Sequence, residues 1–331
     1  MNKHAHYAAL AKDAPGGGTG KRITMKNVFI DGSAGTTGLR IAERLAQRAD
    51  IQLLRLPEEY RKDPAARKEI MNRADIVFFC LPDDAAREAA AMVENRETAV
   101  IDTSTAHRTA ESWVYGFPEI GSLREKIKTA KRIANPGCHA SGFIALIAPL
   151  VEAGLVSAGA ELTCTSLTGY SGGGKKMIAE YEGENRNVLL DAPRQYGMSQ
   201  NHKHLPEMQK LCGLENTPIF CPIVAPYYAG MEVTVPLFAG QIKGGKAEIE
   251  KVYADYYRNG LVRFVKDRNE SGFLSAGAFA GRDDMEITVS GNEERLLLVA
   301  RFDNLGKGAS GAAIQNMNLL LGVDEKTGLV V

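Results

Sequence analysis

The feature that most constrains the fold of this sequence is the regular alternation of short apolar runs with helix-like segments between Met25 and Asp102. The apolar runs are continuous, which is typical of parallel strands that are buried on both faces. Strands are expected over residues 28–31, 51–56, 75–81 and 99–102, and helices over residues 36–48, 64–72 and 83–95. Strands that alternate with helices in this way predict an α/β domain with a Rossmann-like, doubly wound parallel sheet.

The second half of the chain has a different pattern. A strand over residues 132–135 and an apolar helix over residues 141–151 are followed by segments such as EVTVPLFAGQI, in which apolar and polar residues alternate. Alternation is typical of a mixed or antiparallel sheet with one exposed or interface face. We therefore expect residues 138–309 to form an α+β catalytic and dimerisation domain with a mixed sheet. Residues 25–137 form the cofactor domain in this interpretation, and a C-terminal helix within residues 310–331 completes it.

Composition and charge exclude several classes of protein. The 331 residues contain 40 Lys and Arg and 40 Asp and Glu, so the chain lacks the basic excess of a nucleic-acid-binding protein. No apolar run approaches the roughly 20 residues of a membrane span. Five widely spaced cysteines without a CxxC pair favour neither a disulfide framework nor a structural metal site. We expect a cytoplasmic protein without nucleic-acid or membrane partners and without a metal, preceded by a flexible leader over residues 1–24.

The segment IDGSAGTTGLRIAERL places glycines between the first expected strand and the first expected helix. Glycines in such a turn let backbone amides approach a pyrophosphate, and the helix N-terminus favours its negative charge. The spacing G-x-x-G-x-x-G is one residue longer than the usual dinucleotide fingerprint, and a tight turn packed on a neighbouring helix is the alternative. We predict that this loop binds the cofactor through Gly32, Ser33, Ala34, Gly35, Thr36, Thr37 and Gly38.

The end of the second expected strand bears on the choice of cofactor. In Rossmann folds an acidic residue at this place selects NAD, whereas a basic residue accommodates the 2′-phosphate of NADP. Here Arg55 ends the strand, and Arg61 and Lys62 follow in the same loop. Glu58 and Glu59 also lie in this loop, so a solvated loop of mixed charge is the alternative. Arg55 favours NADP(H) as the cofactor.

The stretch NPGCHASG contains the candidate nucleophile. Cys138 is expected at the C-terminal end of a parallel strand and at the start of a helix. Ligands of α/β sheets collect at that edge, and free backbone amides at a helix start lower the pKa of a thiol. The other four cysteines lie in apolar strands or beside a loop, and we interpret them as packing residues. A small apolar residue in a turn is the alternative interpretation of Cys138.

A reactive thiol needs a proton partner. His139 follows the cysteine directly, but consecutive side chains on a helix diverge by about 100°, so His139 is a weak candidate. The segment NHKHLPE carries His202 and His204, whose rings share one side if the chain is extended there, as Pro206 favours. Glu207 would then orient one ring as the third member of a relay. A polar surface loop, or a metal pair without its other ligands, is the alternative.

Three basic residues are candidates for binding an anionic substrate. Arg108 in DTSTAHRT offers a two-pronged donor that suits phosphate or carboxylate. In SGGGKK, a glycine-rich turn can present backbone amides beside Lys175 and Lys176. An ordinary solvated charge is the alternative for each of them.

The motifs GSAGTTG, LPDDAA, DTSTAHR, NPGCHASG, SGGGKK, HKHLPE and DNLGKGASGAAIQNMNLLLG follow one another along the chain. In these motifs, and over nearly all of residues 25–331, the sequence resembles the N-acetyl-γ-glutamyl-phosphate reductases in their shorter variant, and more broadly the aspartate-semialdehyde dehydrogenase superfamily. The resemblance implies that an acyl phosphate is reduced with NADPH to a semialdehyde, with release of phosphate, in arginine biosynthesis. It also implies a homodimer or homotetramer whose other partners are these small molecules.

The resemblance further implies a role for each motif. Cys138 is the nucleophile that forms a thioester, and HKHLPE supplies the acid-base histidine. The motif does not fix which of His202 and His204 has this role, and we favour His202. The turn that begins at Asn304 closes on the nicotinamide side of the cofactor. The cofactor contacts expected outside the glycine loop are Arg55, Ser104, Asn304, Gly306, Gly308 and Ala309, and the expected substrate contacts are Arg108, Asn135, Lys175 and Lys176.

Three other functions stay open at this point. An aspartate-semialdehyde dehydrogenase would share the cofactor domain and the cysteine chemistry, but not the HKHLPE and KGASGAAIQNMN patterns. A related reductase could act on a longer or carrier-linked acyl phosphate, because pocket length is invisible in a sequence. From a different class, the chain could be an NADP-sensing binding protein with an inactive site.

Overall fold

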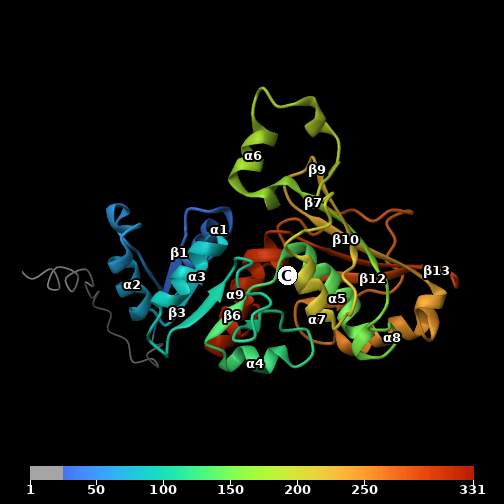
Figure 1. The fold of residues 1–331 in the computed structure, drawn as a ribbon, viewed down its shortest axis with the longest axis horizontal. Helices are drawn as coiled ribbons and strands as arrows, with labels where there is room; N and C mark the ends of the chain where they lie inside the picture. The colour runs from blue at the N-terminus through green and yellow to red at the C-terminus, as the bar shows by residue number, and fades with distance from the viewer. Residues whose placement is uncertain (1–24) are drawn as a thin grey trace, which may run out of the picture.

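The computed structural model describes residues 25–331, so the expected leader over residues 1–24 lies outside the described residues. Two β-sheets organise this part of the chain, and helix α9 (Gly311–Leu321) lies in the middle of the molecule (Figure 1). No helix within residues 25–331 has the length and apolar character needed to cross a membrane. The expected fold class, a Rossmann-like parallel sheet joined to a domain with a mixed sheet, is confirmed.

The first sheet has six parallel strands in the order β2-β1-β3-β4-β6-β5. Its strands are β1 (Lys26–Asp31), β2 (Ile51–Leu54), β3 (Ile76–Phe79), β4 (Ala99–Asp102), β5 (Val114–Tyr115) and β6 (Arg132–Ala134). The helices around it are α1 (Thr36–Leu45), α2 (Pro64–Arg73), α3 (Asp83–Met92) and α4 (Leu123–Thr129). Buried side chains of α1, α4 and α9 form the apolar core on one face, and those of α2 and α3 form the core on the other. The continuous apolar strands are therefore covered on both sides.

Several expected boundaries differ from those in the structure. Helix α1 ends at Leu45 rather than at residue 48, because the chain already turns there and Arg48 pairs with Asp50 at 2.6 Å. Strand β2 ends at Leu54 rather than at residue 56. The sequence did not predict β5 and α4, which have two and seven residues and are too short to show a periodic pattern.

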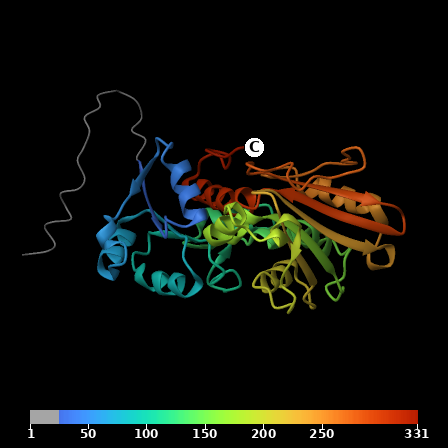
Figure 2. The same ribbon diagram turned by 90° about the horizontal axis from the view of Figure 1, so that it is seen from above.

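The second sheet has seven strands in the order β11-β12-β13-β10-β7-β9-β8. It is mixed, since β7 and β9 run parallel whereas β10 is antiparallel to both β7 and β13. Its strands are β7 (Thr163–Gly169), β8 (Arg194–Gln195), β9 (Ile219–Ala225), β10 (Met231–Phe238), β11 (Val262–Phe264), β12 (Met285–Gly291) and β13 (Arg295–Phe302). Helices α5 (Cys138–Glu152), α7 (Leu205–Cys212) and α8 (Gly245–Tyr256) pack against it in one apolar core. Figure 2 shows these helices and strands side by side with the first sheet along the long axis of the molecule.

Helix α6 (Gly174–Glu182) belongs to a separate arm that stands away from the second sheet (Figure 1). The remaining short elements are 3-10 helices and one π-helical turn: Glu58–Tyr60, Tyr170–Gly173, Val188–Asp191, Ala239–Gln241 and the π-helical turn Gly306–Ser310. The glycine-rich turn before α6 is the part of the arm that faces the first domain, since a β-carbon at Gly174 would lie 4.0 Å from the hydroxyl oxygen of Thr36 at the start of α1.

A buried ion pair connects the C-terminal turn with both sheets. Lys307 donates to the two carboxylate oxygens of Glu119 at 3.0 and 2.8 Å, and to the side chain of Gln315 at 2.6 Å. Glu119 also accepts the backbone N–H of Leu261, at the start of the segment that forms β11. The Lys307 and Glu119 side chains are both 1% exposed, so water does not compete for the pair. This contact fixes the π-helical turn where the two domains meet.

Candidate active site

The glycine loop between β1 and α1 has the geometry of an anion-binding turn. Gly32 has a φ of +86°, and a β-carbon there would lie 2.2 Å from the carbonyl oxygen of Cys80. A β-carbon at Gly38 would lie 2.7 Å from the carbonyl oxygen of Gly32. Gly35 precedes α1 in extended conformation, and no side chain within the described part of the chain caps the helix. The free amides of the first turn are therefore available to a ligand.

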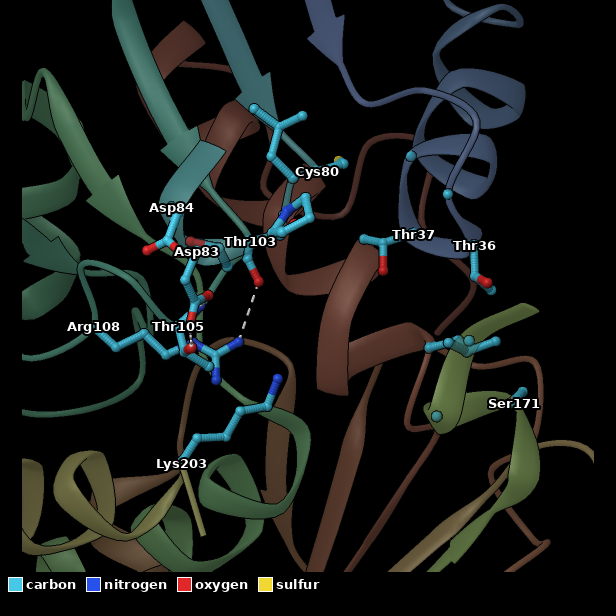
Figure 3. Close-up of a pocket in the computed structure, with 18 residues that line it drawn as sticks. Thr36, Thr37, Cys80, Asp83, Asp84, Thr103, Thr105, Arg108, Ser171 and Lys203 are labelled. Carbon is cyan, nitrogen blue, oxygen red and sulfur yellow. Dashed lines mark hydrogen bonds between the residues drawn. The ribbon is translucent and has the colours of Figure 1, made fainter. Parts of the chain in front are cut away.

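A cavity of about 490 Å³ opens at this helix start, and we call it the loop cavity (Figure 3). Residues from both domains line it, including Gly35, Thr36, Thr37, Gly38, Ser104, Thr105, Ser171 and Lys203. The hydroxyl of Thr36 is buried and has no hydrogen-bond partner within residues 25–331. A buried hydroxyl without a partner is unfavourable, so a cofactor phosphate at this place would satisfy it. The residues present thus fit a dinucleotide.

A second cavity, of about 750 Å³, lies at the ends of β1 and β2, and we call it the distal cavity. It meets the loop cavity at Leu81, and Gly32, Ser33 and Arg55 line it, whereas Ala34 lines neither cavity. Arg55 is exposed and makes no hydrogen bond or ion pair with any residue of the range 25–331, whereas Arg61 donates to both carboxylate oxygens of Glu58 at 2.8 Å. Lys62 also lines this cavity, is exposed and has no such partner, so Arg55 at the strand end and Lys62 in the loop are both free to meet an anion, whereas Arg61 is not.

Cys138 begins α5 and lines a third cavity, of about 440 Å³, which we call the thiol cavity. Gly137 precedes it as the N-cap, so the sulfur lies beside the free amides of the first turn. The sequence predicted a lowered thiol pKa for this reason. In the structure burial raises the pKa of Cys138 to about 11, although Arg108 and the backbone N–H of His139 oppose the rise. The effect of thiolate desolvation on the pKa is therefore larger than the opposing effect of the backbone amides at the helix start.

The HKHLPE segment is not extended, contrary to the expectation. It forms a turn, and α7 begins at Leu205 with Pro206 in its first turn, where the missing N–H of proline costs nothing. The turn still brings the rings of His202 and His204 together, with centroids 4.7 Å apart, and both rings line the thiol cavity. Burial, with Lys203 and Arg108, lowers the pKa of His202 to about 4, and burial and Arg108 also lower the pKa of His204 well below its usual value.

The relay hypothesis required Glu207 to orient a histidine ring, but in the structure it does not. Its nearest carboxylate oxygen lies 3.9 Å from Nε2 of His204, which is too far for a hydrogen bond. Its hydrogen bonds go instead to Nη1 of Arg108 at 2.8 Å, to the hydroxyl of Tyr115 at 2.7 Å and to the backbone N–H of Gly137 at 3.1 Å. Glu207 therefore holds an arginine and the turn in front of the cysteine.

His139 is enclosed between two hydroxyl groups. Its Nδ1 lies 2.7 Å from Oγ of Ser166 and its Nε2 lies 2.7 Å from the hydroxyl of Tyr196, and burial lowers its pKa to about 3. Because both ring nitrogens already have partners, His139 has none left for the thiol of Cys138. This agrees with the geometric argument from the sequence.

The expected anion-binding residues do not all reach the cavities. Arg108 lines both the loop and the thiol cavity, and Asn135 lines the thiol cavity while it donates to the carbonyl of Ala309 at 3.0 Å. Lys175 and Lys176 are exposed on α6 and line none of the three cavities. The glycines of SGGGKK form the turn that lines the cavities. The two lysines come after this turn, on the first residues of α6, where their side chains are exposed.

The C-terminal turn lies directly against the cysteine. A β-carbon at Gly308 would come within 2.9 Å of the β-carbon of Cys138, and Asn304, Gly308 and Ala309 line the thiol cavity. The side chain of Asn304 connects the C-terminal turn to two other segments of the second domain, since it accepts a hydrogen bond from the N–H of Gly230 and donates one to the hydroxyl of Ser171, both at 3.0 Å. Gly306 lines none of the cavities, because its α-carbon packs on the carbonyl of Arg282. Ser104 lines the loop cavity and donates to Asp102 at 2.7 Å.

Sequence reasoning missed several residues of the site. Lys203 lines both the loop and the thiol cavity, and Tyr196 lines the thiol cavity. Lys203 stands between the two histidines of HKHLPE, so its position in that motif was a usable signal. Nothing in the sequence around Tyr196 distinguishes it from any other tyrosine. Among residues 25–331, no group of three or more His, Cys, Asp and Glu side chains is arranged to hold a metal ion.

Comparison with known families and structures agrees with this geometry. Residues 27–130 match the family described as semialdehyde dehydrogenase, NAD binding domain, and residues 138–304 match semialdehyde dehydrogenase, dimerisation domain. The aspartate semialdehyde dehydrogenase II of Vibrio cholerae, solved in complex with ASA, superimposes with a TM-score of 0.68 at 18% identity, over 90% of this chain and 98% of that one. The aspartate semialdehyde dehydrogenase of Candida albicans, solved with NADP, gives a TM-score of 0.62 at 15% identity, over 90% and 98%. These structures show the fold.

Sequence relatives identify the family. The N-acetyl-gamma-glutamyl-phosphate reductase of Sinorhizobium medicae is 45% identical over 305 residues, which cover 89% of this chain and 98% of the relative. The reductases of a Nostoc species and of a Chelativorans species are 42% and 46% identical over 319 and 306 residues, which cover 91% and 89% of this chain and 98% and 97% of theirs. The expected resemblance, enzyme class and nicotinamide cofactor are confirmed by these matches. The chain therefore belongs to the N-acetyl-gamma-glutamyl-phosphate reductase family, within the semialdehyde dehydrogenases.

Proposed function

We propose that this protein reduces N-acetyl-γ-glutamyl phosphate with NADPH to N-acetylglutamate semialdehyde and phosphate, a step of arginine biosynthesis. One observation carries the proposal: the thiol cavity around Cys138 and the loop cavity at the start of α1 share Thr37, Thr103, Arg108 and Lys203 in their linings. A nucleophile and a dinucleotide loop therefore open into one continuous space. The relatives that share 42% and 46% identity with this chain carry the name of this reaction, and they support the choice of substrate.

The cofactor is held by the first domain in this proposal. The start of α1 and the hydroxyl of Thr36, which has no hydrogen-bond partner within residues 25–331, would bind its pyrophosphate, and Arg55 in the distal cavity would meet the 2′-phosphate that distinguishes NADP from NAD. The C-terminal turn with Gly308 and Ala309, which lines the thiol cavity, would hold its nicotinamide end. When bound, NADPH supplies the hydride that reduces the acyl group.

Cys138 carries the acyl group. Its thiolate attacks the γ-carbonyl carbon, so that a carbon–sulfur bond forms and the bond from that carbon to the phosphate oxygen breaks. The backbone amides at the start of α5 stabilise the negative charge on the carbonyl oxygen. Phosphate leaves with its negative charge against Arg108, which uses Nε, Nη1 and Nη2 once each for Asn135, Glu207 and Thr103. A guanidinium has five N–H groups, so two remain for the phosphate.

His202 is the hydrogen-bond donor to the reacting carbonyl oxygen in this mechanism. Its Nδ1 accepts the backbone N–H of His204 at 3.2 Å, so the proton of the neutral ring resides on Nε2. Because the pKa of His202 is lowered to about 4, this neutral ring is the resting form at pH 7. The Nε2–H group can donate a hydrogen bond to the carbonyl oxygen of the acyl group on Cys138 and so stabilise the negative charge that develops there, while the ring itself stays neutral. His204, whose buried Nδ1 has no hydrogen-bond partner within residues 25–331, is the alternative donor.

The second domain also carries a surface suited to self-association. The face of the second sheet opposite α5, α7 and α8 exposes Ile219, Phe238 and Leu297, which are 58%, 67% and 43% exposed. The strand register places these three side chains on the same face. We place the dimer contact of a homodimer or homotetramer here, and the domain boundary between Gly137 and Cys138. The cytoplasm is the compartment that five free cysteines fit best.

Turnover in the oxidative direction tests the proposal. The protein should reduce NADP when N-acetylglutamate semialdehyde and phosphate are both present, and much more slowly with aspartate semialdehyde or with longer semialdehydes. Preference for aspartate semialdehyde would make the chain a dehydrogenase of that substrate, and no turnover with any aldehyde would favour a binding protein.

The covalent step has its own test. Cys138→Ser should abolish turnover and leave NADPH binding nearly intact, while Cys221→Ser, at a partly buried position outside the three cavities, should keep both. Mass spectrometry of the wild-type protein mixed with acyl phosphate should show one acyl group on Cys138. Activity retained in Cys138→Ser would exclude the thioester.

A further inference from the structure

The loop cavity and the thiol cavity are lined by the same two cationic side chains, Arg108 and Lys203. Among the described residues that line the loop cavity or the thiol cavity, Arg108 and Lys203 are the only Lys or Arg side chains. Arg108 comes from the loop after β4, and Lys203 comes from the turn before α7 in the other domain. Figure 3 shows the ammonium end of Lys203 directed into the pocket. The two cations thus approach one space from different domains.

The ammonium group of Lys203 is available to a ligand. It makes no hydrogen bond and no ion pair with a residue of the range 25–331, although two carboxylates, Asp83 and Asp84, line the loop cavity with it. Asp83 instead accepts the N–H and the hydroxyl of Thr105, and Asp84 pairs with Arg87 at 2.9 Å. No carboxylate of the described chain lines the thiol cavity. An anion that enters there meets the ammonium group of Lys203, which lowers the pKa of Asp83 by its charge but makes no hydrogen bond or ion pair with that carboxylate or with any other residue of the range 25–331.

The leaving group of the reaction needs more donors than Arg108 can offer. Three of the N–H groups of Arg108 are used within the protein, by Asn135, Glu207 and Thr103. A phosphoryl group presents three acceptor oxygens and between one and two negative charges at pH 7. The two remaining N–H groups of Arg108 leave at least one oxygen and part of this charge without a partner. A lysine ammonium adds three donors and one positive charge.

We propose that Lys203 is a phosphate-binding residue, which together with Arg108 clamps the phosphoryl group of the acyl phosphate during reduction, and inorganic phosphate in the reverse direction. The inference rests on the proposed function, because that function supplies the phosphoryl group. It assigns the lysine between the two histidines to the leaving group rather than to the cofactor or to the carboxylate of the substrate. It also explains how the phosphate, as it departs from the carbon bound to Cys138, keeps both cations as partners.

Kinetics in the oxidative direction separate these assignments, because phosphate, semialdehyde and NADP each have their own KM. In Lys203→Gln the KM for phosphate should rise by about 10-fold to 100-fold, which is the range for one lost hydrogen bond to a charged group. The KM for NADP and the KM for the semialdehyde should stay close to those of the wild type. Lys203→Arg should recover most of the affinity for phosphate. Lys251→Gln, which removes an exposed lysine from α8, is the matched control and should change none of the three values.

A second measurement does not depend on turnover. Inorganic phosphate should slow the alkylation of Cys138 by iodoacetamide in the wild-type protein, as followed by mass spectrometry of the peptide that contains it. The concentration that gives half-protection should rise by a similar factor in Lys203→Gln and recover in Lys203→Arg. NADPH binding, measured by fluorescence, shows whether each variant is folded.

The two measurements distinguish failure of this inference from failure of the proposed function. Protection by phosphate that depends on Lys203 supports the inference even if the wild-type protein turns over none of the aldehydes tested. An unchanged half-protection concentration in Lys203→Gln overturns it even if the reductase activity is confirmed. A change confined to the KM for NADP, or to the KM for the semialdehyde, overturns it as well and assigns Lys203 to that ligand.

Discussion

Arg108 and Glu207, 99 residues apart in the sequence, form a buried ion pair in which Nη1 of the guanidinium lies 2.8 Å from Oε1 of the carboxylate. The second oxygen of Glu207 accepts from Tyr115 and from the backbone N–H of Gly137. Burial works to lower the pKa of Arg108, but Glu207 and Tyr115 outweigh it and raise that pKa. One carboxylate therefore holds Arg108 and the turn before Cys138 in a single arrangement.

Removal of this carboxylate should cost both stability and activity. In Glu207→Ala the guanidinium of Arg108 is left buried and unpaired, so the free energy of unfolding should fall by about 3 to 5 kcal/mol. Urea unfolding measures this loss. Tyr115→Phe removes one hydrogen bond to the same carboxylate and should cost only about 1 kcal/mol. Equal losses in the two variants would contradict the role of the Arg108–Glu207 pair.

Gly137 is enclosed so tightly that a methyl group should disturb the site. A β-carbon there would lie 2.4 Å from Nη1 of Arg108, 2.5 Å from Oε1 of Glu207 and 2.6 Å from Nε2 of His204. Because these atoms must move, kcat of Gly137→Ala should fall by about 100-fold. Gly240→Ala is the matched control, since a β-carbon there would meet no atom of residues 25–331 within 4 Å, and its kcat should be unchanged. A normal kcat in Gly137→Ala would show that the site tolerates the displacement.

The reactivity of Cys138 should depend steeply on pH. Since burial raises the pKa of the thiol to about 11, the thiolate is a minor species at neutral pH in the ligand-free protein. Below that pKa the thiolate fraction, and with it the rate of alkylation by iodoacetamide, should rise about tenfold per pH unit. N-acetylcysteine, measured in parallel, should level off at about pH 8.5 to 9. A plateau for Cys138 near neutral pH would instead indicate a thiolate stabilised by the start of α5.

Arg55 should decide between the two dinucleotides. In Arg55→Ala the KM for NADPH should rise by about 10-fold to 100-fold, because a charged hydrogen bond to the 2′-phosphate is lost, whereas the KM for NADH should hardly change. Arg61→Ala is the matched control, since its guanidinium is already engaged by Glu58. Steady-state kinetics with both cofactors check the prediction. An equal rise for NADPH and NADH would remove Arg55 from the 2′-phosphate site.

The fold was largely predictable because its signals are local. The buried strands β3 and β4 read as continuous apolar runs, and Gly32 and Gly38 mark a turn that no larger residue could form. The short elements β5 and α4 carry no such pattern. Pro206 was misleading, because proline is as well suited to the first turn of a helix as to an extended segment.

The electrostatics of the site could not be predicted in the same way. The pKa of Cys138 depends on how deeply the thiol is buried, and the hydrogen bonds of Glu207 depend on Arg108 and Tyr115, which lie far away in the sequence. Lys175 and Lys203 are each found beside promising motifs, and only the three-dimensional structure shows that one is exposed on α6 while the other lines two cavities.

The return of α9 to the first domain has a consequence for synthesis of the chain. The apolar core between the first sheet and α1 contains Ile314 and Met317 together with Val28 and Ile41. The cofactor domain is translated first, yet this part of its core stays open until the last helix has left the ribosome. Until α9 has been synthesised, the nascent protein thus carries an uncovered apolar face on the first sheet, the kind of surface that promotes aggregation and that chaperones bind.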